Sequence, residues 1–180
     1  MYKRQFPVTT AEIYDPATFQ WVPTGPMNVA RTNHKLFLAP DGRAVAVGGQ
    51  SSLYQESQIL SVEIFDPATG TWTLSSAPSQ LLPHAAVTQL ADGRLLATGG
   101  HGAINSPAVF LFDPSTGQWT AKAPMLSGRT HHSTALLQDG RVLVAGGFAD
   151  SYSSLRAEAE IYNPATDAWT AAAPMPTAPR

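Results

Sequence analysis

The chain has 180 residues, and 43% of them are hydrophobic, which is a large enough share to form a packed core. Charged residues make up only 13%, while 14 Gly and 15 Pro favour a fold of strands and turns. A formal charge of −2, without any basic block, argues against nucleic acid as a partner. No apolar run approaches the roughly 18 residues that a spanning helix needs, so we expect no membrane insertion.

A short motif recurs four times along the chain. Each copy has an aromatic residue, then Asp-Pro or Asn-Pro, and a Trp seven residues after the aromatic. Asp or Asn followed by Pro favours a type I turn, because Pro restricts φ and the preceding side-chain oxygen bonds the turn backbone. Each copy therefore predicts a hairpin. The aromatic residues are Tyr14, Phe65, Phe112 and Tyr162, and the tryptophans are Trp21, Trp72, Trp119 and Trp169.

A second motif lies between successive copies of the first. It consists of Asp-Gly-Arg, four mostly apolar residues and a Gly pair, and the pairs are Gly48-Gly49, Gly99-Gly100 and Gly146-Gly147. Asp-Gly between apolar runs predicts a type I′ hairpin turn, which needs positive φ at both central residues. The runs at 132–137 and 142–145 lack clean alternation, which predicts strands covered on both faces. A repeat is therefore predicted to be a meander of four antiparallel strands.

This repeat resembles the kelch repeat. The resemblance rests on a hydrophobic run ending in Gly-Gly, a variable loop, and then an aromatic, six residues and Trp. It implies an all-β fold, a kelch-type β-propeller arc of about three and a half four-stranded antiparallel blades. The Trp-Asp dipeptide of another common propeller repeat is absent. The run Asp-Gly-Arg-Val-Leu-Val-Ala-Gly-Gly is most similar to bacterial kelch repeats and galactose-oxidase-like propellers.

Counting these elements divides the chain into a non-repeat segment, a half-blade, three blades and the start of a further blade. Their predicted bounds are 1–10, 11–24, 25–77, 78–124, 125–174 and 175–180. Closed propellers have about four to eight blades, so we expect a piece of a longer protein whose exposed terminal blades self-associate. In the half-blade, Phe19 stands where Gly70 and Gly117 stand in later copies, and a bulky residue is costly there if the position needs positive φ.

The irregular segments at 50–61, 101–107 and 148–157 lie at one end of the predicted blades. Loops that vary on one face of a repeat fold are usually its binding face. These segments mix aromatic rings with amides and imidazoles, which suits recognition of a peptide or a sugar, although loops that bind nothing have similar compositions. The ligand-binding candidates are Tyr54, Gln55, His101, Asn105, Phe148, Asp150, Tyr152 and His131.

Histidines and carboxylates recur at other repeat positions. We align His34, His84 and His132 with one another at the start of the innermost strand, where they could bind zinc or copper but more simply brace neighbouring blades. In this alignment His101 and His131 have no repeat counterpart, which makes them better functional candidates. Recurring carboxylates are expected to pair with blade arginines, and they are Glu12, Glu63 and Glu160.

The sequence shows no catalytic motif of the serine-hydrolase, phosphate-loop or zinc-protease type. We therefore expect a non-catalytic binding module for a protein or glycan, with no metal and no cofactor. The alternative is the propeller part of a secreted galactose-oxidase-like copper oxidase whose catalytic residues lie outside this chain, since the chain has no cysteine for a Tyr-Cys cofactor. No signal peptide is visible, and a secreted or periplasmic location is implied by the resemblance alone.

Overall fold

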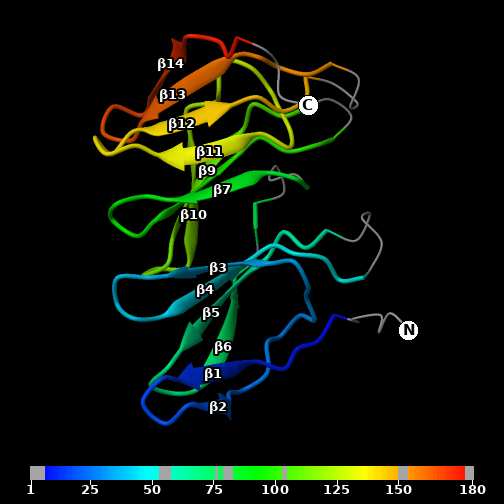
Figure 1. The fold of residues 1–180 in the computed structure, drawn as a ribbon, viewed down its shortest axis with the longest axis vertical. Helices are drawn as coiled ribbons and strands as arrows, with labels where there is room; N and C mark the ends of the chain where they lie inside the picture. Colours follow the sequence, from blue (N-terminus) through cyan, green and yellow to red (C-terminus); the bar gives the residue numbers. More distant parts are fainter. Residues whose placement is uncertain are drawn as a thin grey trace. The chain divides into compact units, whose positions relative to one another are not determined.

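The computed structural model describes residues 7–52, 58–75, 77–78, 83–102, 105–149 and 154–176. The chain forms two compact units, Met1–Ala77 and Pro78–Arg180, which we call the N-terminal and C-terminal units and describe separately. In both units, the described residues form antiparallel β-sheets and no helix (Figure 1). Over these ranges there is accordingly no helix long and apolar enough to cross a membrane.

The N-terminal unit contains a two-stranded and a four-stranded sheet. The pair consists of β1 (Glu12–Asp15) and β2 (Gln20–Pro23). The second sheet has the order β3-β4-β5-β6, with β3 (Lys35–Leu38), β4 (Ala44–Val47), β5 (Val62–Asp66) and β6 (Thr71–Ser75).

The C-terminal unit contains two four-stranded sheets. The first has the order β7-β8-β9-β10, with β7 (Ala86–Gln89), β8 (Leu95–Thr98), β9 (Val109–Asp113) and β10 (Gln118–Lys122). The second has the order β11-β12-β13-β14, with β11 (Ser133–Leu136), β12 (Val142–Ala145), β13 (Ala159–Asn163) and β14 (Ala168–Ala172). Sequential order in every sheet confirms the predicted all-β fold of four-stranded meanders.

The outer hairpin has the same register in all four sheets. The aromatic residue faces its Trp across the strand pair in each, as in Tyr14 with Trp21 and Tyr162 with Trp169, at ring centroid distances of 5.2 and 5.0 Å. The Asp or Asn of each turn also accepts a backbone N–H two residues on, for example Ala68 N–H to Asp66 Oδ1 at 2.8 Å. The predicted side-chain bond in this turn is therefore confirmed, and it explains why the turn sequence recurs.

The Asp-Gly turns differ from the predicted type I′ geometry. Gly42 has a φ of +86°, but Asp41 does not have a positive φ, and Gly42 N–H bonds the carbonyl of Ala39 at 3.0 Å. This pattern fits a type I turn followed by a glycine in the left-handed region. Asp41 can adopt that turn because its carboxylate accepts both the backbone N–H and the guanidinium of Arg43, at 3.2 and 2.8 Å.

The core lies under the central strands of each sheet. All four residues of β8 are buried, and the C-terminal unit has a core cluster that includes Leu96, Leu111, Val142 and Val144. The prediction that both faces are covered is wrong for β11, where Leu136 is exposed and only one residue is even partly buried. Edge position alone is not the cause, because β7 is also an edge strand of its sheet and two of its four residues are buried.

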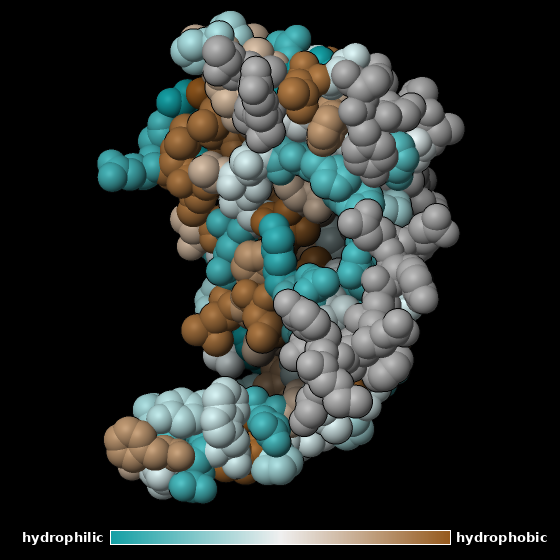
Figure 2. Space-filling view, turned by 45° about the vertical axis from the view of Figure 1, so that its right-hand side comes forward, coloured by the Kyte–Doolittle hydropathy of each residue, from teal (hydrophilic) through white to brown (hydrophobic). Residues whose placement is uncertain are grey.

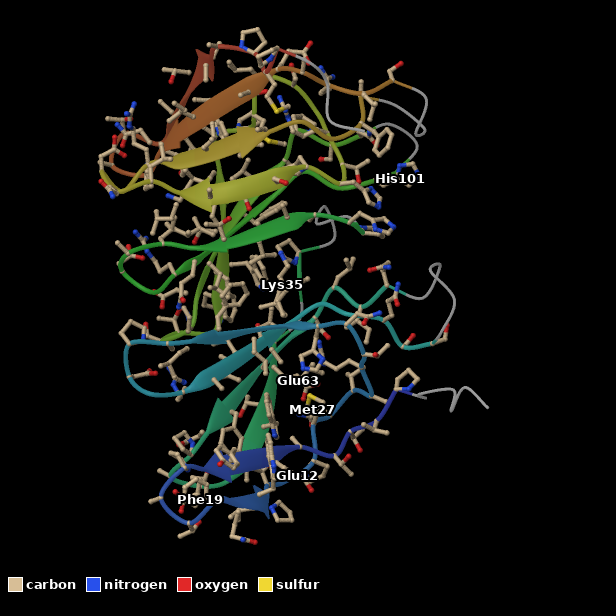
Figure 3. The ribbon with its side chains drawn as sticks, in the orientation of Figure 1. Glu12, Phe19, Met27, Lys35, Glu63 and His101 are labelled. Carbon is tan, nitrogen blue, oxygen red and sulfur yellow. The ribbon has the colours of Figure 1, made fainter. Side chains whose placement is uncertain are left out.

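Phe19 adopts the left-handed conformation that its place in the repeat requires. Its φ is +58°, close to the +69° of Gly70, and the register of β1 with β2 is maintained (Figure 3). A side chain in this region costs about 1–2 kcal/mol, and Phe19 gains little packing in return because it is 75% exposed. We expect Phe19→Gly to stabilise the N-terminal unit by about 0.5–1 kcal/mol after glycine's greater chain entropy is counted. Urea denaturation would measure this, and a destabilised variant would contradict it.

Candidate functional site

Two buried ion pairs hold the segments that lead into β3 and β11. Arg31 bonds Glu63 at 2.7 Å, and Arg129 bonds Glu160 at 2.5 Å. Burial raises the pKa of Glu63, but hydrogen bonds from Asn28, Arg31 and Val29 outweigh it and leave the pKa below its usual value. The predicted arginine pairing is therefore confirmed at these two carboxylates.

The same expectation is wrong for Glu12. Its side chain is exposed on β1, and within the described ranges no arginine pairs with it. Glu12 belongs to the two-stranded sheet, which has no inner strand pair among the described residues. The arginine that Glu63 meets lies in the lead-in to just such an inner pair, so Glu12 has the repeat position without the surroundings that bury its counterparts.

Two backbone positions recur in each four-stranded sheet. Both lie at the end of the sheet opposite to the Asp-Gly turn. The residue after the Gly pair bonds the segment before the inner strand, as Gln50 does with Thr32 and Phe148 with Thr130. The second glycine allows this approach, because a Cβ on Gly147, whose φ is +87°, would lie 2.4 Å from the carbonyl oxygen of Thr130. Each sheet therefore presents two side chains here, one from the lead-in and one from the residue after Gly-Gly.

His84 occupies a different repeat position from the one that the sequence predicted. It lies eight residues before Asp92, just as His131 lies eight residues before Asp139. The two histidines and Asn33 share left-handed φ values of 60°, 53° and 54°. His84 is thus the counterpart of His131, and counting back from the Asp-Gly turn would have revealed it.

The histidines His84 and His131 meet in the C-terminal unit. Their rings stack with centroids 4.2 Å apart and an interplanar angle of 26°. Phe148 lies edge-on to the His131 ring at 6.1 Å. His131 is exposed, whereas His84 and Phe148 are partly buried. An aromatic surface with polar ring nitrogens therefore forms from three separate loops.

The residues His101 and Asn105 join this surface through a hydrogen-bonded loop. The His101 N–H donates to the carbonyl of Pro83 at 2.7 Å, which places this loop beside His84, and Figure 3 labels the His101 side chain there. The His101 ring Nδ1 lies 3.1 Å from Asn105 Oδ1, and Asn105 Nδ2 donates to the carbonyl of Phe148 at 2.8 Å. Asn105, only 7% exposed, is therefore a positioning residue between two loops.

The close packing of this loop depends on a glycine in its neighbour. A Cβ on Gly128 would lie only 2.1 Å from the carbonyl oxygen of Asn105. The backbone of Ser106 also accepts a hydrogen bond from Arg129 N–H at 3.3 Å. The side chain of Arg129 is buried and orders the lead-in to β11. Its backbone bond to Ser106 also fixes the position of the nearby His131 relative to Asn105.

We call the three histidines His84, His101 and His131 the imidazole cluster, and neighbouring members of the cluster lower the pKa values of His84 and His131. Burial lowers the pKa of His84, and the charges of His131 and His101 lower it further. Burial and the charge of His101 likewise lower the pKa of His131. Both rings are therefore largely neutral at pH 7.

His132 has structural surroundings. His132 is buried, and its Nε2 lies 2.8 Å from the hydroxyl of Thr98 on β8, so it links the two sheets of the C-terminal unit as expected of a bracing residue. In the described part of the chain, no three His, Asp or Glu side chains are grouped in a way that could hold a metal ion.

Four of the eight predicted ligand-binding residues are therefore brought together, namely His101, Asn105, His131 and Phe148. The remaining four lie outside the described residues, and they are Tyr54, Gln55, Asp150 and Tyr152.

Comparison with known proteins identifies the repeat. Residues 129–176 match the family model of the Kelch motif, which covers the β11–β14 sheet and its lead-in. No curated protein matches the chain. The other two four-stranded sheets have the same order, register and turn chemistry as the matched one. The chain carries a kelch motif at residues 129–176 within an all-β structure of kelch-type four-stranded blades.

Proposed function

We propose that this chain is a non-catalytic module that binds a protein ligand through the end of the C-terminal unit that carries His84, His101, His131 and Phe148. Kelch modules typically mediate protein interactions, which supports the choice of a protein over a glycan. The proposal concerns this chain alone, and the oxidase alternative has no support among its described residues.

The observation that carries the proposal is the variation of side chains on a constant backbone. The two recurring positions hold Asn33 and Gln50 in one sheet, His84 and His101 in the next, and His131 and Phe148 in the third. Elsewhere the repeat keeps its Gly pairs, its Asp-Pro or Asn-Pro turns and its tryptophans. The backbone geometry is the same at these positions while the side chains differ, which is the pattern expected where a ligand and not the fold determines the side chain.

The chemistry of these positions suits a protein surface. Stacked imidazoles and a phenyl edge supply flat apolar area at low conformational cost, and ring nitrogens and amides direct hydrogen bonds. The Asn105 bonds to His101 and to the Phe148 backbone order this surface before a ligand arrives. Such preorganisation reduces the entropy lost on binding.

A graft between repeats tests the proposal. In the variant His131→Asn with Phe148→Gln, the C-terminal unit receives the pair of the first four-stranded sheet, where Asn33 Nδ2 and Gln50 Oε1 lie 3.1 Å apart. This change keeps a side chain that tolerates positive φ, so the fold should be retained. We expect the parent chain to select a set of sequences from a random peptide display library, and the graft to lose at least about tenfold in affinity for them.

A matched control removes a side chain from the other end of the same hairpin. Arg141 follows the Asp-Gly turn, is 44% exposed and bonds only its neighbour Asp139 in the contacts seen here. Arg141→Gln should leave the selected peptides bound. The proposal is wrong if the graft, shown by circular dichroism to be folded, binds the same peptides with unchanged affinity.

The β1–β2 hairpin supports a separate proposal, that two copies of the chain associate through it. Ile13 and Tyr14 of β1 are 45% and 42% exposed, whereas Ile64 and Phe65 at the equivalent positions of β5 are 6% and 5% exposed. Trp21 and Val22 of β2 are also exposed, at 63% and 53%. In Figure 2 the lower end of the view, where β1 and β2 lie, is mostly teal and pale, with a brown side chain projecting from it. An exposed apolar face beside a strand edge favours pairing with another chain.

Association through this hairpin predicts a concentration-dependent mass in sedimentation equilibrium. Trp21→Gln with Val22→Gln should shift the chain towards monomer and weaken the association at least about tenfold. Leu74→Gln is the control, because Leu74 is an exposed apolar residue of β6 outside the hairpin. Equal masses for the parent and the hairpin variant at every concentration would contradict the proposal.

A further inference from the structure

We infer that the imidazole cluster recognises carboxylate side chains of an acidic peptide segment and holds them in mildly acidic solution. This inference rests on the proposed function, because it names the chemistry of the ligand that the same surface would take. It depends on the geometry of the cluster and on the charges that surround it.

The geometry brings two imidazoles into contact and places the loop of a third beside them. The His84 and His131 rings stack at 4.2 Å, and the loop of His101 is hydrogen-bonded to the residue before His84. Protonating a stacked pair of imidazoles places like charges close together, which is unfavourable unless an anion lies beside them. A carboxylate from a ligand supplies that anion and accepts hydrogen bonds from the ring N–H groups.

The other described charged groups at this end of the C-terminal unit are engaged with one another. The guanidinium of Arg129 is buried against Glu160, and that of Arg156 lies 3.9 Å from Glu158 while donating to the carbonyl of Gly128. Arg156 and Glu158 largely offset each other in charge. Among the described residues at this end, the imidazole cluster is therefore the group whose charge, once protonated, is not offset by a neighbouring carboxylate.

The direction of the pH effect follows from linkage. In the free chain, burial and the neighbouring imidazoles hold the pKa values of His84 and His131 below the usual histidine value. A bound carboxylate favours the cationic rings and so raises these pKa values. Affinity therefore increases as the pH falls from the bound-state pKa to the free-state pKa, and it becomes constant below the latter. Glutamate in a peptide stays mostly ionised down to about pH 5, because its own pKa is about 4.3.

The test uses the full chain and a synthetic peptide in which Glu alternates with Gly and Ser, with the same peptide carrying Gln for Glu as the uncharged control. We expect the Glu peptide to bind several-fold more tightly at pH 5.5 than at pH 7.5, because a one-unit rise in one histidine pKa gives a change of up to about tenfold. The Gln peptide should show no such change. The ring proton signals of His84 and His131, followed by NMR, should shift with added Glu peptide at pH 5.5.

The variant His84→Asn with His131→Asn removes both titratable rings and retains the fold, because Asn33 occupies the same repeat position with a φ of +54°. We expect it to lose the acid-dependent gain, and Arg141→Gln to keep it. The inference is overturned if the Glu peptide binds equally at both pH values, if the Asn variant keeps the gain, or if no binding occurs. Loss of library peptides in the graft, with no binding of the Glu peptide, would leave the protein-binding function standing and reject only the carboxylate ligand.

Discussion

Replacing Trp169 by Ala should lower the free energy of unfolding of the C-terminal unit by about 3–5 kcal/mol. Trp169 packs against the buried core cluster, which includes Leu111 from the preceding repeat and Met125 from the lead-in to β11, and its ring lies 5.0 Å from that of Tyr162. Its indole N–H donates to the carbonyl of Ala123 at 2.8 Å. The substitution therefore opens a cavity between the two sheets and leaves a carbonyl without its partner. Urea denaturation followed by far-ultraviolet circular dichroism would measure the loss.

Trp21 provides a matched control for this substitution. It has the same place in the repeat motif and the same pairing with an aromatic residue, but it is 63% exposed. Trp21→Ala should therefore change stability by less than about 1 kcal/mol, since little surface is returned to water. If both substitutions had similar effects, the tryptophans would act through the hairpin alone, and packing between sheets would not explain the repeat.

Local sequence chemistry predicted the outer hairpins well. The turn of each aromatic-to-Trp motif is determined within a few residues, because a side-chain oxygen of Asp or Asn accepts a backbone N–H of the turn. The strand register follows from the turn, so Phe65 faces Trp72 and Phe112 faces Trp119 as expected from the spacing. These features need no knowledge of the rest of the molecule.

Features that depend on neighbouring segments were harder to predict. Asp-Gly is compatible with more than one turn, and the bonds from Arg43 to Asp41 accompany a type I turn here instead of type I′. The residues of β11 predict a strand covered on both faces, but Leu136 on this strand is exposed. Glu12 has the sequence of a paired carboxylate, yet the inner strands that would bring an arginine to it are not in its sheet.

The candidate site was likewise predicted only in part. The composition of the irregular segments identified His101, Asn105, His131 and Phe148, because polar and aromatic residues in variable loops are what a binding face requires. His84 was assigned instead to the position of buried His132, an error of one residue in the repeat alignment. A shift of one residue changes which face of the chain a side chain is predicted to occupy. The stacking of the His84 ring on His131 was therefore found only in the structure.

The buried ion pair of the C-terminal unit should be equally important for stability. Arg129→Leu is expected to cost about 3–5 kcal/mol, because it leaves Glu160 buried without its cationic partner. The side chains of Arg129 and Glu160 are 0% and 3% exposed, so water cannot replace the lost contact without a rearrangement. Arg129 also donates to the carbonyls of Gly146 and Glu158, at 3.1 and 2.9 Å, and these acceptors lose a donor as well.

The middle repeat suggests the variant that isolates the charge effect. It has Leu82 at the sequence position of Arg129, and Phe110, which is 7% exposed, at that of Glu160. Arg129→Leu with Glu160→Phe removes both charges and should be more stable than Arg129→Leu alone, because no unpaired carboxylate remains buried. It should still be less stable than the parent, since the N–H groups of Leu126 and Ser127 lose the Glu160 carboxylate that they bond at 2.7 and 3.1 Å. A double-mutant cycle by urea denaturation should give a coupling energy of at least about 1 kcal/mol, and additive effects would mean that the pair acts only through packing.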